Sequence, residues 1–204
     1  MNDHLTSLLH VSADDGTGPI VIQHPAVVGV RCFERVSDYA YAAPGGARWL
    51  SVHDLGARRP DPADLPPGGT VIVFEQISPP AGWLGPAGVD TEGALPCGEA
   101  VLSVIMDVDA HPAAIDAFHG WYEEEHLPTL VAVPGIDAAR RFHAVAGELG
   151  AGGRERFLAL YELRSVEVLS TPAWAAASAM TPRTEKVLPH LSWASQLYRA
   201  VPSA

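Results

Sequence analysis

Long apolar runs, clustered basic residues and closely spaced cysteines are all missing from this chain of 204 residues. No stretch approaches the roughly 20 consecutive apolar residues that a membrane-spanning helix needs, so we expect no membrane as a partner. The 13 basic residues are scattered and outnumbered by 24 acidic ones, which gives a net charge of −11. This charge argues against nucleic acid, whose phosphates require clustered Lys and Arg, and would repel an anionic membrane surface.

Motifs for secretion, redox chemistry and nucleotide binding are missing as well. The N-terminus lacks a basic region followed by a long apolar core, so we expect no signal peptide and a cytoplasmic location. Cys32 and Cys97 form neither a CxxC pair nor a zinc-ligand spacing, which predicts packing or surface roles. The glycine pairs have no strand–GxGxxG–helix context, and no GxSxG sequence occurs. We therefore predict neither a nucleotide cofactor nor an acyl-enzyme.

What the chain does contain is the composition of a globular protein with a substantial core: 48% hydrophobic and 18% charged residues. Its length suits one large domain or two small domains of about 100 residues each. A weak internal repeat favours two. Residues 18–36 align with residues 127–145 so that two prolines, one arginine and one phenylalanine coincide, and residues 47–56 then align with residues 155–164. The constant order of these matches predicts a duplication.

The second half has the pattern β-α-β-β-α-β. Alternating and β-branched segments predict four strands, at residues 100–109, 136–146, 156–163 and 190–201. A long helix is predicted from Pro112 to about residue 133, where Pro134 and Gly135 end it. An interrupted helical region is predicted at residues 165–188.

The first half keeps the strands and loses most of the helices. Its four strands are predicted at residues 5–13, 27–36, 49–55 and 70–77. Short or Pro-rich segments stand where the second half has helices. The predicted organisation is a degenerate first repeat, a Pro- and Gly-rich linker and a second repeat that carries a site, at residues 1–78, 79–99 and 100–204.

The stretch FHGWYEEEHLPTLVAVPG, residues 118–135, is the most informative part of the sequence. Wound as an α-helix at about 100° per residue, the segment gathers Phe118, Trp121 and Tyr122 on one apolar side. Large aromatic side chains on one helix face predict burial against a sheet or a bound molecule.

Three consecutive glutamates in this stretch are predicted to differ in environment. Glu123 and Glu124 point to solvent, whereas Glu125 falls in the middle of the apolar side and His126 lies on its flank. A buried carboxylate beside a histidine is costly unless it is paired or used, so Glu125 and His126 indicate a functional site.

Structural explanations for the same two residues stay open. Glu125 would be a structural acid if it formed a salt bridge to Arg140 or Arg156. His126 would be a helix-end histidine favoured by the helix dipole. A kink before Pro128 would change the direction of the histidine side chain.

A metal site is a further alternative. His119, Glu123 and His126 share a helix face, but Glu123 is expected to be solvated and no HExxH sequence occurs. We therefore predict no metal.

The motif WYxxEHxP, followed by a Pro-Gly turn and then by ARRF and RFLALYEL, resembles the dimeric α+β barrel superfamily, particularly its EthD-like members. The resemblance covers about residues 101–201. It implies an α+β fold of two tandem ferredoxin-like (βαββαβ) repeats, the first helix-poor, whose antiparallel sheets form a barrel-like pseudo-dimer. The family includes polyketide cyclases, cofactor-free monooxygenases, dehydratases, decarboxylases, isomerases and haem-handling enzymes, so ligation of haem by His126 is another alternative.

Our first hypothesis is a cofactor-independent enzyme that acts on a hydrophobic, aromatic or polyketide-derived small molecule. Glu125 and His126 would transfer protons, assisted by Tyr122, in a cyclisation, dehydration or isomerisation. The residues expected to contact substrate are aromatic or basic: Phe118, Trp121, His143, Tyr161, His190 and Trp193.

Two other functions remain open. One is a cofactor-free monooxygenase acting on an activated aromatic. The other is a non-catalytic protein that binds a small molecule or has only a structural role. The predicted partners are a small hydrophobic molecule and, through the sheets, a second copy of the chain.

Overall fold

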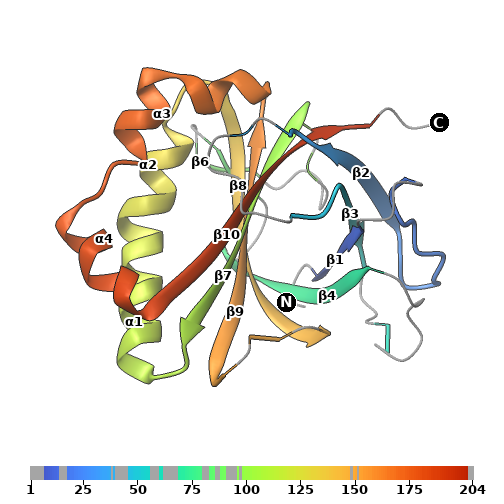
Figure 1. The fold of residues 1–204 in the computed structure, drawn as a ribbon, viewed down its shortest axis with the longest axis horizontal. Coiled ribbons are helices and arrows are strands. Elements are labelled where there is room, and N and C mark those ends of the chain that lie inside the picture. The colour runs from blue at the N-terminus through green and yellow to red at the C-terminus, as the bar shows by residue number, and fades with distance from the viewer. Residues whose placement is uncertain are drawn as a thin grey trace.

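The computed structural model of the protein contains one continuous β-sheet with the helices gathered on one side of it (Figure 1). It describes residues 7–13, 18–37, 39, 46–55, 60–61, 69–79, 83–85, 88–90, 96, 98–147, 149–150 and 152–201. Cys97, one of the two cysteines considered above, lies outside these ranges. Within them, no helix combines the length and apolar character required to cross a membrane.

The first half forms an antiparallel sheet of β1 (Ser7–Ala13), β2 (Gly29–Arg35), β3 (Trp49–Asp54) and β4 (Thr70–Ser78). The strand order is β4-β1-β3-β2, that of a ferredoxin-like unit. Between β1 and β2, the described part of the connection contains a turn and no helix. The helix-poor first repeat is therefore confirmed.

The second half repeats the same order with longer strands. These strands are β7 (Ala100–Asp109), β8 (Ile136–Gly147), β9 (Arg154–Leu163) and β10 (Leu191–Ala200), arranged as β10-β7-β9-β8. Each lies within about two residues of its predicted position, because alternation of apolar and polar residues marks strands well.

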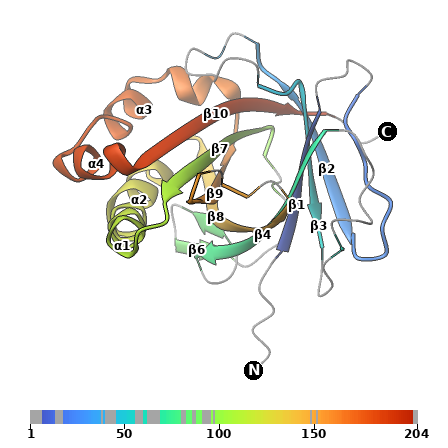
Figure 2. The same ribbon diagram turned by 60° about the horizontal axis from the view of Figure 1, so that its bottom comes forward.

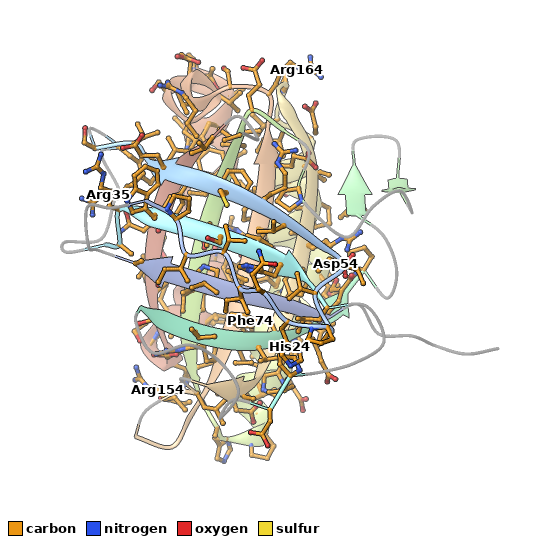
Figure 3. All side chains as sticks on the ribbon, turned by 90° about the vertical axis from the view of Figure 1, so that its right-hand side faces the viewer. His24, Arg35, Asp54, Phe74, Arg154 and Arg164 are labelled. Atoms are coloured by element: carbon orange, nitrogen blue, oxygen red, sulfur yellow. The ribbon has the colours of Figure 1, made fainter. Side chains whose placement is uncertain are left out.

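The two sheets join at both edges and close a barrel. β2 pairs with β10, where Phe33 faces Ala200, and β4 pairs with β8, where Phe74 faces Ala144. Eight of the described strands thus form a ring, and every pair in it is antiparallel. In Figure 3 the first-half strands cross in front of the second-half strands, with side chains between them. The predicted barrel-like pseudo-dimer is confirmed.

A short hairpin lies in the segment predicted to be the linker. It consists of β5 (Trp83–Gly85) and β6 (Gly88–Asp90), and it joins the edge of β8, where Leu84 faces Ala139. Strands of three residues are too short to show an alternating pattern, which explains why the sequence did not reveal them.

The helices cover the face of the second-half strands that lies away from the first half (Figures 1 and 2). A long helical segment runs through α1 (Pro112–Trp121) and α2 (Leu127–Val131). Two shorter helices follow β9, namely α3 (Pro172–Ala177) and α4 (Pro182–Val187), flanked by the 3₁₀ turns η3 (Val166–Ser170) and η4 (Leu188–His190).

The starts of these helices follow from the sequence. The side chain of His111 accepts a hydrogen bond from the Ala113 amide, and Thr171 and Thr181 cap α3 and α4 in the same way. A proline follows each cap at the first helical position, where its missing N–H costs nothing.

The long helix is interrupted by one wide turn, η2 (Tyr122–His126), with π-helical geometry. The Leu127 amide donates to the Tyr122 carbonyl, five residues earlier, instead of four residues earlier as in an α-helix. Pro128 follows directly; a proline lacks an N–H and its ring clashes with the carbonyl four residues before it. The wide turn therefore accommodates Pro128 without breaking the helix, and it changes which residues face the sheet.

Candidate functional site

A cavity of about 410 Å³ lies between the helices and the second-half strands. It is lined by aromatic and aliphatic side chains with a few polar groups: Tyr39, Leu102, Val104, Met106, Trp121, Tyr122, His126, Leu130, Tyr161, Trp174, Ala175, Ser178, Ala179, Met180, Thr184, Leu188, Leu191, Trp193 and Ser195. Among these lining residues there is no Asp, Glu, Lys or Arg. Apolar walls with few polar groups are typical of small-molecule sites.

Strand alternation explains which side chains reach this cavity. In β7, Leu102, Val104 and Met106 face the helices, whereas Val101 belongs to the barrel interior. β10 contributes every second residue in the same way, from Leu191 to Ser195. The sheet therefore has two different faces, a packed barrel core and a cavity wall.

His126 is the basic group of the cavity. Its ring stacks on Trp121 with centroids 4.4 Å apart and planes 29° apart, and it meets the edge of Tyr122 at 4.9 Å. Burial, and secondarily the positive charge of Arg141, lower the pKa of His126 to about 4. The imidazole is therefore neutral at neutral pH and can accept a proton.

Two tyrosines form a hydrogen-bonded pair behind this histidine. The hydroxyl oxygens of Tyr122 and Tyr161 are 2.8 Å apart, and both side chains are buried. Burial raises the pKa of each tyrosine, so both phenols are neutral. One hydrogen bond between two hydroxyls uses only one of their two protons, which leaves the pair a donor for an oxygen of a bound molecule.

Arg141 of β8 is a buried charged residue next to the cavity wall that the sequence did not indicate. Its side chain is completely buried, and the guanidinium carbon lies 4.2 Å from the centre of the Tyr122 ring and 4.9 Å from that of Phe118. It donates to Glu123 Oε1 at 3.2 Å and contacts His119 Nδ1 at 3.1 Å. The sequence of β8 does not indicate that this arginine is buried beside the cavity, because its contact partners belong to a helix that is distant in the sequence.

The structure does not place Glu125 as the sequence analysis expected. Its side chain is 28% exposed, accepts a hydrogen bond from the Thr181 hydroxyl and lies 3.9 Å from the Arg183 Nε atom. It does not line the cavity, and the expected partner Arg156 instead binds Asp107. The π-helical turn explains the difference: it adds a residue to one turn, so the angle of about 100° per residue fails and His126 takes the inward position.

Three other predicted substrate contacts lie outside the cavity lining. Phe118 is buried behind the wall, with its ring centre 5.0 Å from that of Phe157. His143 stacks on the same Phe157 at 4.9 Å and pairs with Glu155 at 3.2 Å. His190 hydrogen-bonds Asp109 at 3.2 Å, on the surface.

The remaining predicted residues converge on the cavity: Trp121, Tyr122, His126, Tyr161 and Trp193. Trp193 is 56% exposed and forms part of the rim. Among the described residues, no three His, Cys, Asp or Glu side chains are close enough together to hold a metal ion.

Several lining residues were not anticipated. Trp174, Ser178, Met180 and Thr184 come from the α3–α4 region, whose cap-and-proline sequences predicted helix starts but not their positions in space. Tyr39 comes from the first half, so the first repeat contributes to the cavity.

Two solved structures share this architecture over nearly the whole chain. An anthrone oxidase-like protein superposes with a TM-score of 0.57 and 14% identity, over 98% of this chain and 92% of that chain. A proposed chlorite dismutase superposes with a TM-score of 0.53 and 10% identity, over 97% of this chain and 95% of that chain. No protein-family model and no curated protein matches the sequence.

These likenesses concern the fold, and the EthD-like assignment stays a prediction. The strand order, the closed antiparallel ring and the structural neighbours agree with one another. The chain is an α+β protein built of two tandem ferredoxin-like units whose antiparallel sheets close one barrel.

Proposed function

We propose that this cavity is the active site of an oxygenase that needs no resident cofactor and oxidises a planar, hydroxylated aromatic compound, with His126 as the general base. One observation carries the proposal: a neutral imidazole lies among aromatic rings in the wall of a cavity that is large enough for a small molecule. The fold similarity to an anthrone oxidase-like protein supports the choice of substrate class.

The chemistry begins with a carbon or oxygen acid held against the aromatic wall. His126 removes a proton from the substrate, and the resulting carbanion or enolate is rich enough in electrons to reduce dioxygen. For an anthrone-type CH₂ group, the carbon loses two hydrogens and gains one oxygen atom of O₂, and the other oxygen atom leaves as water. The Tyr122–Tyr161 pair would donate a hydrogen bond to the oxyanion that develops on the ring.

The position of Glu125 favours oxygenation over the dehydration or cyclisation considered first. Those reactions need an acid and a base at the same substrate, and the carboxylate expected for the pair lies outside the cavity. Proton removal and reaction with dioxygen need one base, and the imidazolium formed on His126 can return its proton to the oxygen atom that leaves as water. A single neutral imidazole is therefore sufficient.

The test is dioxygen consumption with anthrone as substrate, corrected for the uncatalysed reaction. We expect His126→Gln to lower kcat by about 10²- to 10⁴-fold, as is typical for loss of a general base. His143→Gln, a matched change outside the cavity, should keep the wild-type rate. Anthrone binding by the wild type without dioxygen consumption would instead indicate a binding protein, and full activity of His126→Gln would refute the role of this residue.

A further inference from the structure

We propose that the cavity selects the anionic form of an acidic phenol or enol, because the buried guanidinium of Arg141 lies directly behind its Tyr122 wall. The inference rests on the proposed function, since it names the substrate class of the same site. It can nevertheless be tested without turnover.

The first argument is the charge around the cavity. None of its described lining residues carries a formal charge at neutral pH, since His126 is neutral and both tyrosines are protonated. A charge immediately behind the wall therefore dominates the local potential, because little water lies between it and a bound molecule.

The second argument is that Arg141 is this charge. Its side chain is fully buried, it cannot lose its proton under ordinary conditions, and its guanidinium carbon is 4.2 Å from the centre of the Tyr122 ring. The carboxylate that pairs with it, Glu123, is 48% exposed and is therefore in contact with solvent as well as with the guanidinium. Water screens the exposed carboxylate more than the buried cation, so the cavity experiences a net positive potential.

The third argument is that the polar groups of the cavity already respond to this charge. Burial is the main cause of the lowered pKa of His126, and Arg141 lowers it further; for Tyr122 and Tyr161, whose pKa burial raises, Arg141 acts in the opposite direction to burial. In each case the positive charge disfavours a cation or favours an anion. A phenolate or enolate in the same space would be favoured for the same reason.

Selection of a phenolate is compatible with His126 as the base, because the phenolate still carries the proton on carbon that His126 removes in the proposed reaction. A bound anion offsets the repulsion between Arg141 and a protonated imidazole, so the histidine becomes a stronger base once the substrate is present. The spare proton of the Tyr122–Tyr161 pair provides a hydrogen bond to the anionic oxygen.

The experiment is a spectroscopic pH titration of 1,2-dihydroxyanthraquinone with protein in excess. This planar phenol changes colour on ionisation and is already oxidised, so it does not turn over. We expect the apparent pKa of the bound probe to be at least about one pH unit below that of the free probe. The corresponding dimethyl ether, which cannot ionise, should bind more weakly above that pH.

Three substitutions identify the source of the effect. Arg141→Met should abolish the shift, whereas Arg141→Lys, which keeps the charge, should retain part of it. Because replacing a fully buried arginine also threatens folding, Glu123→Gln provides a second test at a half-exposed position. Removal of the counter-charge should lower the apparent pKa of the bound probe further.

Several results would overturn the proposal: an unshifted or raised pKa of the bound probe, equal binding of phenol and ether, no binding of either, or a Glu123→Gln effect of opposite sign. The outcome is independent of dioxygen chemistry. A shifted pKa of the bound probe without dioxygen consumption would support the anion site and refute the oxygenase. Dioxygen consumption with an unshifted pKa would support the oxygenase and refute the anion site.

Discussion

Acidification should destabilise this protein through two histidines, the largely buried His126 in the cavity wall and the fully buried His10 in the barrel. Burial lowers the pKa of each to about 4, whereas an unfolded histidine has a pKa of about 6.5. Between these values the unfolded chain binds a proton at each position and the folded chain does not. The free energy of unfolding therefore falls as the pH falls from about 6.5 to about 4, and this contribution levels off below that range.

The size of the effect follows from the difference in pKa. A difference of about 2.5 units corresponds to about 3 kcal/mol for each histidine. His10 should account for the larger share, since it is 3% exposed and its Nε2 atom lies 3.4 Å from the Ser103 hydroxyl oxygen. Because small domains are stable by only about 5–15 kcal/mol, the combined loss is a large fraction of the total.

Urea unfolding at pH 7 and pH 4.5 would measure this dependence, with His126→Gln and His10→Asn as single variants. Each variant should be less sensitive to pH than the wild type by about 2–3 kcal/mol between the two conditions. Equal pH sensitivity in all three proteins would refute the reasoning, since neither histidine would then be held neutral by the fold.

Three further outcomes are expected. Glu125→Gln should keep dioxygen consumption and lose no more than about 1 kcal/mol in urea unfolding, because the contacts of Glu125 to Thr181 and Arg183 are partly exposed. A loss of activity would indicate that Glu125 takes part in the reaction. Tyr161→Phe should cost about 1–2 kcal/mol in the same assay, because Tyr122 loses its buried partner, and an unchanged midpoint would argue against the pair. Ala175→Phe, at an exposed lining position, should prevent probe binding without lowering the thermal midpoint, whereas retained binding would place the ligand elsewhere.

The sequence predicted the fold well because the relevant signals are local. β-Branched alternation marks the strands, and Pro112, Pro172 and Pro182 mark the helix starts. The βαββαβ pattern, together with family resemblance, then predicts the strand order and barrel. The hairpin near Trp83 was missed because three residues per strand carry no periodicity.

The site was predicted less completely because its geometry depends on one irregular turn and on distant partners. A uniform angle per residue directed Glu125 inward, and only the π-helical turn before Pro128 shows that His126 takes that place. The contact between Arg141 and Tyr122 depends on β8 packing against the helix. The place of Tyr39 in the cavity lining depends on how the two halves pack together.

The closed ring has a consequence for symmetry. When two identical subunits form such a barrel, any change in one copy is imposed on the other, so both must keep a working site. Here the edges of the first-half sheet, β2 and β4, are paired with β10 and β8 of the same chain. The covalent connection fixes the ratio of the two halves at one to one and their effective concentration at a high value. One half is thereby free to serve as a closing wall with no helix in its described residues, while the other carries the helices and the cavity beneath them.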